Sequence, residues 1–399
     1  MFYCPPRDIR VSVDVGCKQH QVAVGLSDGQ ILDEFSISHQ PDGFASFFER
    51  LSNLERQYRC PIRVAMEGYN GYARPLDQMI LARGWQLYNI NNLKLARFKE
   101  IFPGAAKTDI LDARKGLELF QLQEHLPTAK DVLQAVAEPP RENQILKRLS
   151  RRRKRLVNER VRVKNLLQSD LQAVCPSLLA LTSDVGNLWF LHFLTSTDEL
   201  TKLARMRLKT VRKISSIGPK YAGVIQKWQK NAQFSAEVEW VGEMIQQDAT
   251  RVLELRQQIK ALEAKMEALI SESSLATIIH SIPGFGPIST AELAGEVGHE
   301  KRFLQESSLA LYLGMAPLSK ESGQYKGSKS PRQVNRRARA AMMVAVDRHR
   351  KQVPASQKYY EKKRAEGKGH NQAIRSLGRQ LCRVIFKMLK EQRSYIPPE

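Results

Sequence analysis

Four carboxylates of the chain have the residue types and spacing for metal-dependent chemistry: Asp14, Glu67, Asp109 and Asp112. Asp14 lies inside VSVDVG, whose alternation of apolar and other residues is typical of a strand. Glu67 ends the apolar stretch VAME, while Asp109 and Asp112 are three residues apart and so share one helix face. Carboxylate oxygens suit Mg²⁺ or Mn²⁺. Two such ions can activate a nucleophile and stabilise the leaving oxygen in phosphoryl transfer.

Each of these acids, taken alone, could instead be a helix cap, a surface charge or half of an ion pair. Their order is more informative: an acid on a first strand, an acid ending a later strand and an acidic pair on a helix. That order is the pattern of an RNase H/RuvC-like nuclease. Buried acids without a metal would repel one another. We therefore expect the four carboxylates to converge on divalent metal.

The stretch LSKESGQYKGSKSPRQVNRRARAAM is rich in serine and glycine and ends in a run of arginines. It could be a flexible linker or a phosphate-handling loop without regular structure. Its serines are Ser319, Ser322, Ser328 and Ser330. Ser330 is best explained as the start of a capping box, with proline at the first position of a helix beginning near Pro331. Ser319 is interpreted as a turn hydroxyl.

Ser322 is the preferred nucleophile, and Ser328 is the second choice. Ser322 precedes a glycine, which allows close backbone approach to a substrate. A serine hydroxyl is a weak nucleophile and needs activation. Nearby arginines could stabilise charge on a phosphate in the transition state. They could equally form a solvated basic face that touches a nucleic-acid backbone. These arginines are Arg332, Arg336, Arg337 and Arg339, of which 332, 336 and 339 share one face of the expected helix.

The fold class expected from these patterns is α/β followed by mostly α. Residues 1–126 alternate strand and helix signals and predict a mixed sheet with flanking helices, including a hairpin at Asp28-Gly29. Residues 127–274 predict basic helices and a second long helix over about 238–270. Residues 275–399 predict a mostly helical C-terminal domain.

The long helix over 238–270 carries apolar residues at alternating steps of three and four, with Asp248 as one polar interruption, which is a heptad seam. The seam predicts either packing inside the chain or an intermolecular coiled coil. Its members are Val238, Val241, Ile245, Asp248, Val252, Leu255, Ile259, Leu262, Met266 and Leu269.

Two further features suggest nucleic-acid contact. A basic run is expected to touch the phosphate backbone, unless it is only a solvated helix face. Its members are Arg151, Arg152, Arg153, Lys154 and Arg155. The turn Pro-Gly-Phe-Gly-Pro, containing Gly284 and Gly286, resembles a helix–hairpin–helix turn, whose backbone N–H groups can meet a phosphate. A purely structural turn is the alternative.

The charge and composition limit the partners. With 63 Lys and Arg against 41 Asp and Glu, the 399-residue chain has a net charge of +22, which favours a polyanion such as nucleic acid. No apolar run is long enough to span a bilayer and the first residues do not form a secretory signal, so no membrane association is expected. The five scattered cysteines form no C-x-x-C pair, so neither a disulfide framework nor a zinc site is expected. We therefore expect a cytoplasmic protein with reduced cysteines.

Several motifs resemble one family. VDVG with Asp14, AMEG with Glu67 and KTDILDA with Asp109 and Asp112 look like the DEDD motif of a class of bacterial insertion-sequence transposases that includes Piv-type DNA invertases. The segments IPGFGPISTAELAGEVG, LALYLGMAP, ESGQYKG and NRRARAAM resemble, in order, the C-terminal transposase domain of that class. ESGQ puts Ser322 at the position of the family's serine.

The resemblance implies a RuvC-like domain that uses Mg²⁺ or Mn²⁺, a coiled coil and a transposase domain with a catalytic serine. It also implies DNA as substrate and a homo-oligomer, dimer or tetramer, in which the carboxylates and the serine meet. Some members are guided by a structured bridge RNA, so a guide RNA is an expected partner. Two rival hypotheses stay open: a metal-only nuclease of the Holliday-junction resolvase type and a non-catalytic nucleic-acid scaffold.

Overall fold

The computed structural model describes residues 7–67, 74–101, 109–123, 132–323, 325–329, 331 and 334–397. The side chains at 93, 320, 321, 325, 326 and 328 lie outside this description. The chain divides into two compact units, Met1–Glu138 and Pro139–Glu399. The basic helices and the C-terminal region, expected separately at 127–274 and 275–399, fall mainly in the second unit.

The first unit contains a six-stranded mixed sheet in the order β3-β2-β1-β4-β5-β6. The first three strands are antiparallel, β4 and β5 are parallel to β1, and β6 is antiparallel to β5. This confirms the expected mixed sheet and the hairpin at Asp28-Gly29. The strands are β1 Ile9–Val15, β2 Gln19–Leu26, β3 Ile31–Ser38, β4 Ile62–Glu67, β5 Gln86–Ile90 and β6 Leu133–Ala135.

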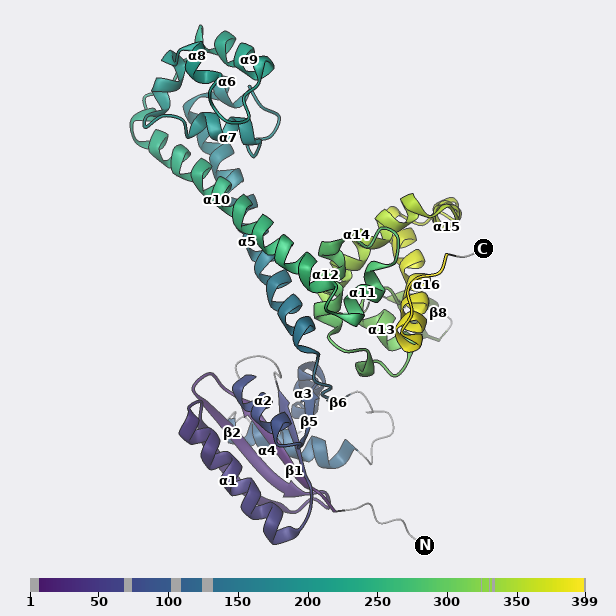
Figure 1. The fold of residues 1–399 in the computed structure, drawn as a ribbon. Coiled ribbons are helices and arrows are strands. Elements are labelled where there is room, and N and C mark those ends of the chain that lie inside the picture. Colours follow the sequence, from purple (N-terminus) through teal and green to yellow (C-terminus); the bar gives the residue numbers. More distant parts are fainter. Residues whose placement is uncertain are drawn as a thin grey trace. The chain divides into compact units, whose positions relative to one another are not determined.

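The two faces of the sheet are covered by different helices. Alternate residues of β1 from Ile9 to Val13 join the phenylalanines of α1, Pro41–Tyr58, in one apolar cluster. The opposite face of β1 meets α4, Asp109–Leu122. There the buried Arg10 donates from Nη1 to the carbonyl of Phe120 at 2.7 Å. Figure 1 shows α1 lying along the sheet, together with the shorter helices α2, Arg74–Ala82, and α3, Asn92–Lys99.

The second unit begins with two long helices that lie side by side, α5 Arg141–Val174 and α10 Val238–Ile270 (Figure 1). Their ion pairs run in opposite order along the two helices. Arg153 of α5 bonds Glu263 of α10 at 2.7 Å, whereas Glu159 of α5 accepts from Arg251 of α10 at 3.0 Å. The pair is therefore antiparallel. Apolar residues of the predicted seam, including Ile245, pack against α5 within the chain.

Short helices complete the end of this helix pair. They share one apolar cluster with α5 and α10, to which Trp189 and Trp228 contribute, whereas Trp240 of α10 is exposed. The helices are α6 Pro176–Leu179, α7 Leu188–Leu194, η3 Leu200–Arg205, α8 Leu208–Val211 and α9 Pro219–Gln229.

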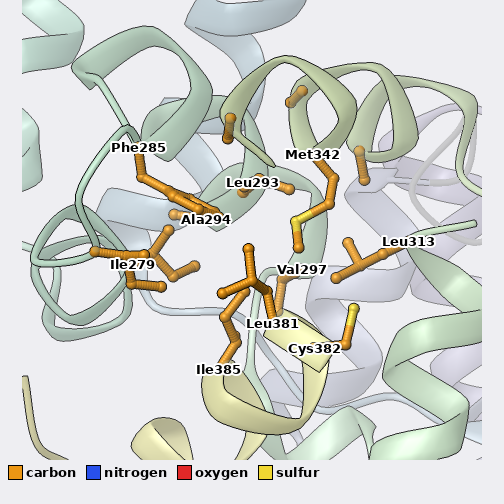
Figure 2. Packing of buried hydrophobic residues seen from close by; sticks show 14 of the residues in the cluster. Ile279, Phe285, Leu293, Ala294, Val297, Leu313, Met342, Leu381, Cys382 and Ile385 are labelled. Carbon is orange, nitrogen blue, oxygen red and sulfur yellow. The ribbon is translucent and has the colours of Figure 1, made fainter. Parts of the chain in front are cut away.

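The C-terminal helices surround a second apolar cluster. Figure 2 shows its labelled side chains, with Phe285, Leu293, Met342 and Leu381 pointing toward one another. Cys382 lies among them, and burial raises the pKa of its thiol to about 12, so it is a core residue. The elements are α11 Ser274–His280, α12 Pro287–Val297, η4 Glu300–Arg302, α13 Glu306–Tyr312, β7 Leu318–Ser322, β8 Tyr325–Lys329, α14 Arg336–Gln352, α15 Pro354–Ala365 and α16 His370–Glu391. None of the described helices is both long and apolar enough to cross a bilayer.

Candidate functional site

Backbone register brings two of the predicted acids to one edge of the first unit's sheet. Val13 of β1 is paired with Met66 of the parallel strand β4. Asp14 and Glu67 are the next residues on these neighbouring strands. Since Val13 and Met66 both point into the α1-side cluster, Asp14 and Glu67 alternate to the face that α4 covers.

The other two acids lie on the first turn of α4, where Asp109 begins the helix and Asp112 follows three residues later. Asp109 is exposed and Asp112 is half-buried. We call Asp14, Glu67, Asp109 and Asp112 the acidic edge. Its helical half is held in place from the far end of α4, where Arg10 bonds the carbonyls of Phe120 and Gln121.

A lysine that the sequence did not single out enters the acidic edge. Lys99 is the last residue of α3, and its Nζ lies 3.2 Å from Oδ1 of Asp112 and 3.9 Å from Oε2 of Glu67. The lysine side chain is 20% exposed. It supplies one positive charge among four carboxylates, which partly offsets their mutual repulsion.

The pKa of Asp14 responds to burial and to the charges around it. Burial raises the pKa of Asp14 to about 6, the positive charge of Lys99 opposes that rise, and the charges of Glu67, Asp112 and Asp109 add to it. The raised pKa means that the ionised form of Asp14 is destabilised by its surroundings. A bound cation would stabilise that ionised form.

The donor set of the acidic edge fits a hard divalent ion, because it consists of carboxylate oxygens alone. Within the described residues, however, no three His, Cys, Asp or Glu side chains are arranged to hold a metal ion. Instead, Lys99 forms ion pairs with Asp112 at 3.2 Å and with Glu67 at 3.9 Å. Asp14, Glu67, Asp109 and Asp112 would have to turn toward an ion to ligate it.

The serine segment is a β-hairpin, so the expected loop without regular structure is wrong. Strands β7 and β8 are antiparallel, with Ser319 paired to Ser328 and Ser322 paired to Tyr325. Gly323 has φ of 56°, a conformation that favours glycine at the turn. Ser322 is the last residue of β7 and is exposed. The hairpin therefore presents this serine at its turn.

The expected helix start near Pro331 is also wrong. Helix α14 begins at Arg336, and the side chain of Asn335 caps it by accepting from the backbone N–H groups of Arg337 and Ala338. An asparagine cap explains this start physically. Ser330 and Arg332 lie outside the described residues. The expected helical face shared by 332, 336 and 339 therefore has only 336 and 339 within the described residues.

The remaining arginines of this segment differ in exposure. Arg336 is exposed, whereas Arg337 and Arg339 are half-buried. Arg337 lies close enough to Glu292 of α12 for its charge to oppose the effect of burial, which raises the pKa of that carboxyl. Among these three, Arg336 is the most exposed to solvent.

A buried carboxylate ties the start of α14 to α5 and was not predicted. Glu296 of α12 is 1% exposed and accepts from Arg151 at 2.7 and 2.9 Å. Nδ2 of Asn335 donates to Glu296 at 2.8 Å and to the hydroxyl of Tyr312 at 2.7 Å. The Tyr312 hydroxyl donates to the carbonyl of Glu296 at 2.7 Å. Burial would raise the pKa of Glu296, but its bonds to Arg151 and Asn335 hold that pKa below its usual range. We call Glu296, Arg151, Asn335 and Tyr312 the Glu296 network.

The basic run of α5 therefore has two kinds of members. Arg151 and Arg153 bond Glu296 and Glu263 inside the chain. The other three members, Arg152, Lys154 and Arg155, are exposed. The hypothesis of nucleic-acid contact rests on these exposed residues.

One of the two glycines in the turn between α11 and α12 is required by the packing of the chain. Gly284 has φ of 86°, and a Cβ there would lie 2.4 Å from the backbone nitrogen of His349 in α14. Gly286 is the N-cap of α12, and the Arg348 side chain lies near it. Gly284 thus permits close packing of α14, and Gly286 remains the candidate for phosphate contact.

Both ends of the chain match family models of transposases. Residues 11–176 match the model for the DEDD domain of IS110 elements, described as a transposase. Residues 276–361 match the model described as "Transposase IS116/IS110/IS902 family". The first match contains all four residues of the acidic edge. The second contains the serine hairpin and α14.

Relatives from insertion elements extend the similarity along the chain. The 44.8 kDa protein of IS116 from Streptomyces clavuligerus is 24% identical and covers 98% of this chain and 96% of its own length. The 43.6 kDa protein of IS110 from Streptomyces coelicolor is 28% identical over 78% of each chain. The 42 kDa protein of IS900 from Mycobacterium paratuberculosis is 36% identical over 37% of this chain and 40% of its own.

Proposed function

Since the chain belongs to the IS110/IS116 family of transposases, we propose that it cuts and rejoins DNA strands through a phosphoserine intermediate on Ser322. The observation that carries this proposal is the exposed Ser322 at the turn of a hairpin, beside a glycine with positive φ. A hydroxyl presented in this way can approach a phosphate that lies in a duplex backbone. The RuvC-like character of the first unit is part of the same proposal and is consistent with its mixed sheet.

The proposed step is an exchange of esters. Oγ of Ser322 loses its proton and attacks phosphorus, one P–O bond of the DNA backbone breaks, and the leaving oxygen takes up a proton. The serine phosphodiester keeps the energy of the broken bond. A DNA hydroxyl can therefore reverse the step on a new strand without ATP.

The acidic edge is proposed to assist this step. Asp14, Glu67, Asp109 and Asp112 would hold Mg²⁺ or Mn²⁺, which would supply positive charge to the phosphate and to the reacting oxygens. The protein's own contribution is to gather the four carboxylates at the ends of β1 and β4 and on the first turn of α4. The two chemistries are proposed to combine in a homo-oligomer.

A covalent adduct tests this mechanism. Wild-type protein should form a protein–DNA species that survives denaturation in stalled reactions, whereas Ser322→Ala should bind DNA normally and form none. Ser328→Ala is the matched control, because it removes a hydroxyl from the other strand of the same hairpin. Loss of the adduct in Ser328→Ala alone would give that serine the role of nucleophile.

Two alternatives predict other outcomes. A metal-only nuclease of the resolvase type would cut DNA in Ser322→Ala and leave no adduct in any variant. A scaffold without catalytic activity would bind DNA equally with and without divalent ions and cut none.

A structured guide RNA is proposed as an additional partner. The net charge of +22 and the exposed Arg152, Lys154 and Arg155 support contact with nucleic acid but do not choose between DNA and RNA. Sequencing of RNA that co-purifies with the protein tests this directly. A defined RNA encoded beside the gene is expected; bulk cellular RNA without enrichment would contradict it.

A further inference from the structure

The C-terminal part of the second unit contains a basic cavity of about 400 Å³. It lies among the base of the serine hairpin, α14, α15, the connection from α15 to α16, and α16. Six cationic side chains line it, and none of the described residues in its lining is an aspartate or a glutamate. The cations are Lys329, Arg339, Lys363, Lys368, Arg375 and Arg379.

Some of these cations already have partners next to the cavity. Lys363 and Lys368 bond the two carboxylate oxygens of Glu366 at 2.9 and 3.0 Å. Arg379 donates to Glu306 at 2.9 Å. These bonds fix the positions of the three side chains and offset part of their charge.

Arg339 and Arg375 differ from the other cations. Both are half-buried, and within the described residues neither has a carboxylate partner. Burial and the charge of Arg339 both lower the pKa of Arg375, so the two guanidinium groups repel each other. Two like charges held together without an acid favour binding of an anion from outside.

The backbone is shaped to hold Arg339 in this place. Gly314 has φ of 68°, and a Cβ there would lie 2.8 Å from Cδ of Arg339. The arginine stem therefore passes directly over the glycine. Neutral donors complete the lining, because Oε1 of Gln372 accepts from Gly369, which leaves the amide nitrogen of Gln372 free to donate outward.

The cavity is close to the serine along the hairpin. Lys329 ends β8 and pairs with Leu318, the first residue of β7, whose last residue is Ser322. At about 3.3 Å per residue, the strand carries the serine about 13 Å from the hairpin base. That distance corresponds to about four steps of a DNA duplex at 3.4 Å per step.

We propose that this basic cavity binds one phosphodiester group of a DNA strand, a few nucleotides from the phosphate that Ser322 attacks. The proposal rests on the proposed function for the position of the DNA, and it adds a binding site with Arg339 and Arg375 as its central donors. Guanidinium groups suit this ligand because they bind phosphate oxygens through two parallel hydrogen bonds. The bound phosphodiester would keep the DNA strand aligned with Ser322 while that serine attacks its phosphate.

The test is DNA binding by Arg375→Gln over a series of salt concentrations, measured by fluorescence anisotropy with a mixed-sequence duplex. Loss of one phosphate contact should lower the slope of log K against log salt by about 1. Arg383→Gln is the matched control, because Arg383 is exposed on the same helix and lies outside the cavity. It should behave as the wild type does. Equal changes in both variants would overturn the proposal.

A second measurement locates the phosphate. Methylphosphonates, which remove the charge of one phosphate, are placed singly along the strand. One position should weaken binding of the wild type and have no further effect on Arg375→Gln. Gly314→Ala, which displaces Arg339, should reduce the effect of the same position. A uniform effect at all positions, or a loss seen only with an RNA duplex, would overturn the site.

Failure of this proposal is distinguishable from failure of the serine chemistry. A position-specific methylphosphonate effect without any covalent adduct supports the cavity and rejects Ser322 as nucleophile. Adduct formation by the wild type and Arg375→Gln, with identical affinities and salt slopes, supports the serine and rejects the cavity.

Discussion

The acidic edge of the first unit and the basic cavity of the second both gather like charges, and they relieve the repulsion differently. The acidic edge contains its own counterion, since Lys99 lies within 4 Å of two carboxylates. Among the described residues, no carboxylate lines the basic cavity, and Arg339 and Arg375 have no acidic partner. A cation arriving at the acidic edge must therefore compete with Lys99. An anion arriving at Arg339 and Arg375 meets no such competitor among the described residues, although Lys363, Lys368 and Arg379 are already paired with acids.

The most severe test of the acidic edge is Asp109→Asn. Recombination should fall on the order of 100-fold or more, since even outer-shell partners of a metal site can be worth that much. Folding should stay near normal, because one like charge is removed from the edge. Recombination assays and thermal unfolding of the same preparation measure both effects. Full activity in this variant, or activity in excess EDTA, would show that the edge has no metal function.

The basic run of α5 repeats the comparison on a smaller scale, because only some of its arginines have internal counterions. Arg151→Gln should lower the free energy of unfolding by about 1–2 kcal/mol. This is less than for a fully buried pair, since the Arg151 side chain is 41% exposed. Arg152→Gln should leave stability unchanged and lower the salt dependence of DNA binding. Chemical denaturation and anisotropy separate the two, and the opposite assignment would contradict the division.

Lys99→Gln sharpens the contrast by removing the internal counterion. Divalent ions should then bind the acidic edge more tightly, on the order of fivefold, because about 1 kcal/mol of competing attraction is lost. Titration with Mn²⁺ followed by calorimetry measures the change, and Arg97→Gln on the exposed side of α3 is the control. Unchanged or weaker binding would mean that Lys99 does not compete with the ion.

The pH dependence of stability in EDTA tests the charge of Asp14 in the absence of a metal ion. The folded pKa of Asp14 is about 6, above the unfolded value of about 3.9. Between these values the folded state binds more protons than the unfolded state, so this contribution to stability is lost as pH rises from about 4 to 6. Asp14→Asn should flatten that part of the stability profile, and Asp42→Asn on the exposed start of α1 should not. Identical profiles for both variants would contradict the assignment.

The strands of the first unit's sheet and the long helix α10 could be predicted because one pattern of apolar residues dominates each. Alternation in VSVDVG fixed the side of the sheet on which Asp14 lies, and the steps of three and four fixed α10. The hairpin of Ser322 could not be predicted, because LSKES and YKGSK have no apolar alternation. Ser330-Pro331 imitates a helix start, whereas Asn335 is the cap because it also bonds Glu296.

The acidic edge and the basic cavity differ in how visible they are in the sequence. The four acids follow recognisable strands and a helix, so their types and spacing could be interpreted. Lys99 ends a short, weakly patterned helix, and only the folded chain brings it to Asp112. The cavity draws its cations from a hairpin, three helices and a connection. No local pattern unites these residues, so the sequence shows only an excess of positive charge.

The Glu296 network also has a mechanical consequence. Arg151 lies near one end of α5, and roughly 35 Å of helix separates it from Val174, at about 1.5 Å per residue. Through Glu296 and Asn335 this point is linked to the N-cap of α14. The helix pair can thus act as a lever whose pivot is the start of α14. A rotation of about 5° about this pivot moves the far end of the helix pair by about 3 Å over that length. A movement of the distal helices therefore causes a much smaller displacement at the start of α14.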